Sequence, residues 1–252
     1  MLGILVVLFI VAIGVVGAAY WFVVRPMLEQ RRLIVNHTPS PLPTPIVKST
    51  PETKQDVGKE VPPYSAPAGA VQFINSDANL DGKLKEHYVD FSFYYPNRWE
   101  KDPKAGVPGA SNFVKVERSL PGAATQENFA VGWYSSAGSE EGDRAVFHSL
   151  AENLSAQYEK NFPEYRKVSE GSTKVGVYDG YQFRFESVSR NTDKGDIKIW
   201  GRVIFLPPVD GGKNGVTLLM LATSLAPELK SVNDVGVKGE LPMMLESFRF
   251  GK

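Results

Sequence analysis

Alternating hydrophobic and polar positions predict strands over most of the chain after residue 86. Residues 87–95 read HYVDFSFYY, so Val89, Phe91 and Phe93 fall on one side of an extended chain and polar or aromatic positions alternate with them. Pro96 ends this segment. Similar patterns predict further strands at residues 113–118, 129–135, 165–174, 181–189, 196–206 and 215–224. Turn-forming residues predict a turn at Tyr178-Asp179-Gly180 and a hairpin loop at PPVDGGKNG, residues 207–215.

Two segments change to helical spacing. In residues 140–161 the apolar positions recur every three or four residues, at Phe147, Leu150, Ala151, Leu154 and Tyr158. Ser139 is suited to cap this helix, and Pro163 prevents its continuation. A second helix is predicted over residues 228–247, with a break near residues 236–242. Strands, a helix, more strands and a terminal helix predict an α+β fold, in which an antiparallel β-sheet is flanked by helices.

The N-terminal segment is apolar over its whole length. Residues 2–24 contain no charged side chain and would form a helix of about 34 Å, enough for a hydrocarbon core of about 30 Å. We therefore predict a transmembrane helix over residues 1–24, which makes the bilayer a partner through residues 2–24. A cleaved signal peptide is the alternative, since Gly17-Ala18-Ala19 resembles a cleavage site.

A proline-rich segment separates this helix from the rest of the chain. Residues 25–35 form a juxtamembrane segment, and residues 36–70 contain Pro39, Pro41, Pro43, Pro45, Pro51, Pro62, Pro63 and Pro67 among Ser, Thr and Lys. Proline disfavours helix and interior strand, so we expect a disordered linker over residues 36–70. The globular domain is predicted at residues 71–252.

Composition excludes several classes of function. The chain has 28 basic and 28 acidic residues and a formal net charge of zero, which gives no basic surface for nucleic acid. It contains no cysteine, so disulfides, thiolate metal sites and cysteine nucleophiles are excluded. The three histidines, His37, His87 and His148, lie far apart in the sequence and predict no catalytic metal site.

One motif could bind a metal ion. Asp77-Ala-Asn79-Leu-Asp81-Gly82 matches the first half of a calcium loop, in which oxygen ligands alternate and glycine permits a sharp turn. The acidic residue expected at the twelfth position is replaced by Tyr88. Asp, Asn and Gly are also ordinary turn residues before a strand. The motif is therefore a weak calcium site, with metal ligands Asp77, Asn79 and Asp81, or a simple turn.

The sequence contains no recognisable catalytic motif. It has no Gly-x-Ser-x-Gly segment, and Gly211-Gly212-Lys213 lacks the spacing of a phosphate-binding loop. Glu140, Glu141 and Asp143 lie at the start of the predicted helix, where the helix dipole accounts for their charge. We expect a protein that is not an enzyme and that needs no cofactor, apart from the calcium ion considered above.

Four segments carry a resemblance to a known family. The strand DFSFYYP followed by Trp99, the segments DGYQFRFE and GVTLLMLATS, and the terminal ESFRF resemble PsbP-like domains. This superfamily includes the photosystem II extrinsic protein, the Ran-binding Mog proteins and membrane-anchored bacterial relatives. The resemblance covers residues 75–252 and implies an α/β/α sandwich around an antiparallel sheet, with a non-enzymatic binding or accessory role. This chain differs from the lipoprotein relatives because it has no lipobox cysteine.

Together these features predict a membrane-tethered, non-catalytic interaction or accessory domain that binds a protein partner of a membrane or envelope assembly. A domain that binds a small ligand or lipid is the alternative. Arg25, Arg31 and Arg32 follow the apolar segment and favour a cytoplasmic position for the globular domain. The long linker, the absence of cysteine and the exported relatives favour the other side, and we predict an extracytoplasmic domain.

Overall fold

The computed structural model describes residues 63–122 and 124–251. The predicted transmembrane helix, the juxtamembrane segment and residues 36–62 of the predicted linker lie outside these residues. Within the described ranges, no helix is both long and apolar enough to cross a membrane.

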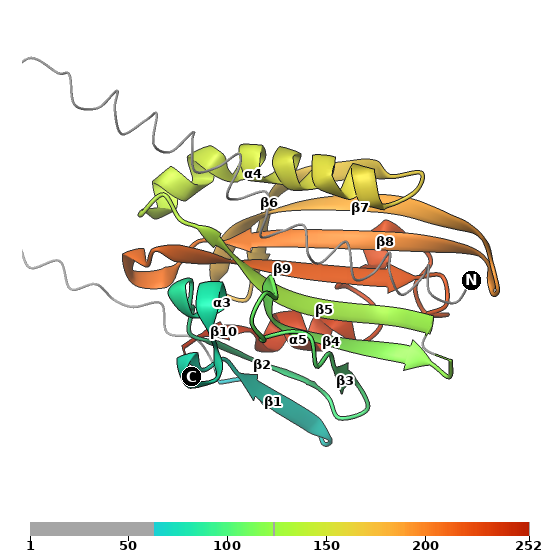
Figure 1. Cartoon of the computed structure of the whole chain (residues 1–252), viewed down its shortest axis with the longest axis horizontal. Coiled ribbons are helices and arrows are strands. Elements are labelled where there is room, and N and C mark those ends of the chain that lie inside the picture. Colours follow the sequence, from blue (N-terminus) through green and yellow to red (C-terminus); the bar gives the residue numbers. More distant parts are fainter. Residues whose placement is uncertain (1–62, 123, 252) are drawn as a thin grey trace, which may run out of the picture.

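Seven antiparallel strands form the main sheet, in the order β3-β4-β5-β9-β8-β7-β6 (Figure 1). The strands span β3 (Glu100–Lys101), β4 (Asn112–Leu120), β5 (Ala124–Ser135), β6 (Arg166–Val175), β7 (Tyr178–Thr192), β8 (Gly195–Leu206) and β9 (Asn214–Thr223). A second sheet has the order β1-β2-β10, from β1 (Ala70–Ile74), β2 (Phe91–Pro96) and β10 (Arg249–Phe250). The predicted α+β class and antiparallel pairing are therefore confirmed.

Helix α4 (Glu140–Asn161) covers one face of the main sheet, as Figure 1 shows. The Ser139 side chain accepts a hydrogen bond from the Gly142 backbone N–H, which confirms the predicted cap. The apolar residues that predicted this helix pack on Phe183, Phe185 and Phe205 of the sheet in one buried cluster. Because successive side chains of a strand point to opposite faces of the sheet, the alternate residues of β7 and β8 lie on the face away from α4.

The opposite face is covered by the small sheet and by short helices. A second buried cluster lies there and includes Phe91 and Phe93 of β2, Phe129 of β5 and Met244 of helix α5 (Leu241–Ser247). Instead of a long helix over residues 228–247, the chain forms the 3-10 helix η4 (Val232–Asp234) and then α5. Gly236 and Gly239 have positive φ angles of 72° and 73°, which interrupt the helix where the sequence predicted a break.

Two predicted features lie elsewhere in the structure, and one strand was missed. The strand expected at residues 87–95 begins at Phe91, because residues 82–86 form the short helix α3 (Gly82–Glu86) and His87 ends it. The turn expected at residues 178–180 lies at Gly176, whose φ of 57° allows it, while Gly180 belongs to β7. A Cβ atom at Gly180 would lie 2.5 Å from the Phe205 carbonyl oxygen, so close packing explains this glycine. Strand β1 was not predicted at all.

Candidate binding site

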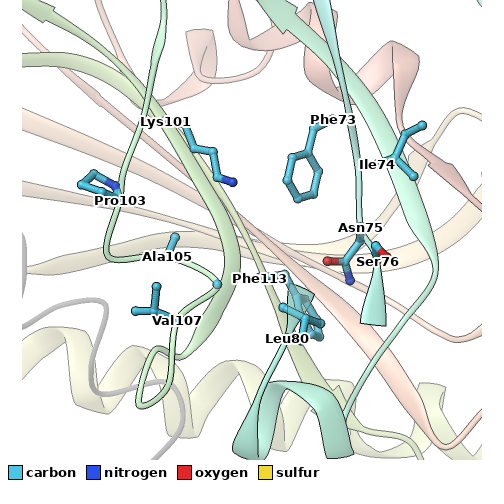
Figure 2. A pocket seen from close by; sticks show the side chains of 11 residues that line it. Phe73, Ile74, Asn75, Ser76, Leu80, Lys101, Pro103, Ala105, Val107 and Phe113 are labelled. Carbon is cyan, nitrogen blue, oxygen red and sulfur yellow. The ribbon is translucent and has the colours of Figure 1, made fainter. Parts of the chain in front are cut away.

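A cleft of about 270 Å³ lies between β1 and the segment that includes β3 and the loop after it (Figure 2). Its lining is mainly apolar and comes from both sheets: Phe73, Ile74, Asn75, Ser76, Leu80, Lys101, Pro103, Ala105, Gly106, Val107 and Phe113. Lys101 is the one ionisable side chain among these residues. A site without a second ionisable group offers no general acid and base pair.

The backbone of β1 has one edge without a neighbouring strand among the described residues. β1 pairs with β2 alone, and the small sheet ends there. The Asn75 N–H donates to the Phe91 carbonyl and the Asn97 N–H donates to the Gly69 carbonyl, both at 2.9 Å. Hydrogen-bonded and non-hydrogen-bonded pairs alternate in antiparallel sheets, so Gln72 and Ile74 direct their N–H and C=O groups away from β2.

Apolar side chains gather around this edge. Val71 and Ile74 of β1 and Val107 of the facing loop are 38%, 44% and 41% exposed. They are half of the large hydrophobic side chains that the described part of the chain exposes. An edge strand with exposed apolar side chains is a template for pairing with another chain.

Phe73 and Lys101 face each other across the cleft (Figure 2). The Phe73 ring rests on Phe91 and Phe93, with centroid distances of 5.9 and 5.5 Å, which fixes its position against the core. The Lys101 Nζ atom lies 5.5 Å from the Phe73 centroid, within the range of a cation–π contact. Lys101 forms no salt bridge with any described residue, so its charge is available to an acidic group.

The predicted calcium motif lies beside the cleft. Asp77 and Asn79 belong to the 3-10 helix η2 (Asp77–Asn79), and Asp81 precedes α3. The Asp81 carboxylate accepts a hydrogen bond from the Gly82 N–H at 2.7 Å. Tyr88, in the twelfth position, donates to the Asn75 carbonyl at 3.2 Å and carries no carboxylate. Calcium binding by Asp77, Asn79 and Asp81 stays a prediction.

The two histidines of the domain have different surroundings. His87 stacks on Trp133 with ring centroids 3.5 Å apart, and its Nδ1 lies 3.0 Å from Asn214 Oδ1. His148 lies on the exposed side of α4 against Glu170 of β6. Glu152 lies nearby, and the three could each offer a metal ligand, but Lys167 bonds both carboxylates. The Lys167 ammonium therefore occupies the position between Glu152 and Glu170 and balances their charge, as a metal ion there would do.

Asp143 has a role that the sequence analysis missed. Its side chain is fully buried and accepts hydrogen bonds from the Ala137 N–H, the Ser136 hydroxyl and the Tyr134 hydroxyl at 2.7, 2.8 and 3.3 Å. Burial raises the pKa of Asp143, although these bonds oppose the rise. Asp143 thus fixes the loop between β5 and α4. This role goes beyond the interaction with the helix dipole that the sequence predicted.

A group of charges around the buried Glu127, at the other end of β4, was also missed. Arg118 forms salt bridges with Glu127, Glu228 and Glu240, the last at 3.1 Å. Trp99 Nε1 donates to Glu240 at 2.6 Å, and Arg98 pairs with the same carboxylate. Three carboxylates share this partly buried arginine, so the group has an excess of negative charge. This excess affects the protonation of Glu127 and therefore the stability of the domain. None of these charged residues lines the cleft.

Comparison with known proteins gives likenesses of fold. No family model and no curated protein matches the sequence. Among solved structures, the chain is similar to LpqN, which is involved in cell envelope biogenesis of Mycobacterium tuberculosis, with a TM-score of 0.43 and 7% identity over 73% of this chain and 92% of that one. It is similar to cyanobacterial PsbP (CyanoP) from Synechocystis, with a TM-score of 0.42 and 14% identity over 73% and 94%.

A third match is the Ran-binding protein Mog1p of Saccharomyces cerevisiae, with a TM-score of 0.38 and 14% identity over 64% of this chain and 89% of that one. CyanoP is named as a PsbP and Mog1p as a Ran-binding protein, which are two kinds of protein that the sequence motifs resemble. At these identities and scores they carry no argument about function.

Proposed function

We propose that the domain is a non-catalytic binding module that holds an extended segment of a protein partner along β1. The observation that carries this proposal is the edge of β1 that no described strand pairs with, beside an apolar cleft. Main-chain hydrogen bonds to an exposed sheet edge give affinity, and pockets for alternate side chains give specificity. Gln72 and Ile74 supply the outward backbone groups, and the cleft accepts one apolar side chain of the bound segment.

The charge at the cleft defines the partner further. Lys101 is the one charged residue of the lining, so a carboxylate next to the apolar residue of the partner would be stabilised there. We therefore expect an extended segment with a medium-sized apolar residue flanked by Asp or Glu.

The tether remains part of the proposal. An apolar segment at residues 2–24 and a proline-rich linker at residues 36–70 support a domain held at a distance from a bilayer. We place the domain on the extracytoplasmic side, where its partner would belong to a membrane or envelope assembly.

A small ligand or lipid is the second candidate for the cleft. The apolar lining supports it, because ligand pockets are mainly apolar with a few polar groups. Sites for drug-sized ligands usually have volumes of about 300–1,000 Å³. The cleft, at about 270 Å³, is smaller and suits a single side chain better.

We expect a displayed library of random peptides to yield ligands of the predicted type when selected against residues 63–252. Substitution Gln72→Pro should weaken their binding at least tenfold, because proline removes an outward N–H and blocks the edge. The ladder with β2 should survive, since Gln72 does not donate to β2.

Gln72→Ala is the matched control, because it changes the side chain and keeps the backbone N–H. It should bind the selected peptides as the parent does, in a titration followed by fluorescence anisotropy. Lys101→Glu should weaken binding of the acidic peptides and spare their neutral analogues. Selection of peptides that bind Gln72→Pro and the parent equally would overturn the proposal, and saturable uptake of a fatty acid in place of peptides would favour the second candidate.

A further inference from the structure

Two arginines lie directly opposite each other inside the fold. Arg184 of β7 pairs in register with Arg202 of β8, and the residues are 9% and 7% exposed. They lie on the sheet face opposite α4, because their neighbours Phe183, Phe185 and Val203 point into the cluster beneath that helix. Like charges opposite each other in a sheet are destabilising, and burial in a low-dielectric environment increases the cost.

Within the described residues, the hydrogen bonds of the two guanidinium groups are all with neutral groups. Arg184 Nη1 donates to the Val232 and Val235 carbonyl oxygens at 2.7 and 3.2 Å. Arg202 Nε donates to Gln182 Oε1 at 2.8 Å, and its Nη2 donates to Thr173 Oγ1 at 3.3 Å. Within residues 63–122 and 124–251, neither arginine has a carboxylate within 4.0 Å.

The acidic groups nearby are already used. Asp234 of η4, which packs over this face, directs its carboxylate to the Lys230 and Ser231 N–H groups and to the Lys238 ammonium. Glu186, two residues along β7, pairs with Arg166 at 2.5 Å. Arg118 differs in this respect, because that partly buried arginine forms salt bridges with three carboxylates.

The electrostatics and the remaining N–H donors both favour an anion beside the two arginines. Burial lowers the pKa of Arg184, and burial together with the neighbouring Arg184 lowers the pKa of Arg202 to about 10. Arg184 Nε and Nη2 and Arg202 Nη1 have no hydrogen-bond partner in the described part of the chain. Guanidinium groups offer their donors in a planar fork that matches oxyanions.

The neighbouring edge strand leaves room beside the pair. Gly171 of β6 lies opposite Gln182, and a Cβ atom placed on it would meet no atom within 4 Å. Residues opposite each other in a sheet share a face, so this open position lies on the same face as the two arginines. Thr173, two residues along, already reaches Arg202.

We propose that Arg184 and Arg202 form a binding site for a small tetrahedral oxyanion such as phosphate or sulfate. Three free donors on two guanidinium groups suit an anion with more than two oxygen atoms. The bound anion neutralises the opposed charges and links β7 to β8 and to the loop that η4 belongs to. This site lies on different elements from the cleft, and its occupation does not depend on the proposed binding of a partner.

The test follows inorganic phosphate binding by residues 63–252, by calorimetric titration and by thermal unfolding at constant ionic strength with chloride as reference. We expect saturable binding and a rise in Tm that saturates with it. Arg202→Gln removes one charge and keeps hydrogen-bonding capacity, and it should weaken binding at least tenfold. It should also remove the saturable rise in Tm.

Arg190→Gln is the matched control, because Arg190 lies on β7 but is exposed and paired with Glu164 and Asp196. It should bind phosphate as the parent does. If Arg202→Gln fails to fold, Arg202→Lys replaces it in the test. This variant keeps the positive charge but loses the planar fork of donors, so it should also weaken phosphate binding. Because phosphate also stabilises folded proteins by exclusion from their surface, equal Tm shifts in the parent and the Arg202 variants would overturn the site, as would no saturable heat.

Discussion

Phe93→Ala should lower the free energy of unfolding of the domain by about 3–5 kcal/mol, since truncation of a buried phenylalanine removes apolar burial and leaves a cavity. Phe93 is fully buried between the two sheets. Its ring lies 5.0 Å from Phe129 of the main sheet in an edge-on arrangement and 5.5 Å from Phe73 of β1. Urea unfolding followed by tryptophan fluorescence measures the change.

The adjacent Tyr94→Ala is the matched control. Tyr94 points to the other face of the small sheet, is partly exposed and contacts Tyr64 at 5.7 Å. Tyr94→Ala should lower the free energy of unfolding clearly less than Phe93→Ala does. If both variants lose the same stability, Phe93 does not join the two sheets in the way described.

Glu127 should make the domain less stable as the pH rises from about 4.5 to 7. Burial raises the pKa of Glu127 to about 7; Arg118 opposes the rise, while Glu228 and Glu240 add to it. In the unfolded chain the pKa is near 4.5, so between these values the folded state holds a proton that the unfolded state has lost. The free energy of unfolding therefore falls as the pH rises through this window, by about 3 kcal/mol in all. Above the window Glu127 causes no further change.

Glu127→Gln tests this effect, because glutamine resembles the protonated acid. The variant and the parent should be about equally stable at pH 4.5, and the variant should be the more stable at pH 8. Glu228→Gln is the control: Arg118 helps to lower the pKa of this half-exposed acid, so its removal should bring no gain at pH 8. A Glu127→Gln variant that is less stable than the parent at pH 8 would show that the ionised carboxylate stabilises the fold.

Regular periodicity is what made most of the fold predictable from sequence. Helix α4 matches the predicted residues 140–161 because its apolar positions follow one helical face. The strands that became β8 and β9 are long, apolar and joined by a glycine-rich loop, so they were found within one residue. Strand β1 escaped because it is five residues long, follows the prolines and is partly exposed on both faces.

The sites were beyond sequence reasoning because they depend on pairing over long distances. The cleft needs β1 to lie beside β2 before Phe73 and Lys101 can meet. The opposition of Arg184 and Arg202 depends on the register of β7 against β8, which one residue of slip would destroy. A local motif such as residues 77–82 was visible at once, because its residues are consecutive in the sequence.

The most direct test of the proposed binding mode is residue-resolved hydrogen exchange of the domain, alone and saturated with a selected peptide. If the peptide adds as a strand, the amides of Gln72 and Ile74 gain protection, because they alternate with the β1 amides that already bond to β2. The amides of β6, which is an edge strand of the main sheet, stay unchanged. Protection that appears away from β1, with Gln72 and Ile74 exchanging as in the free domain, would contradict strand addition as the function of this edge.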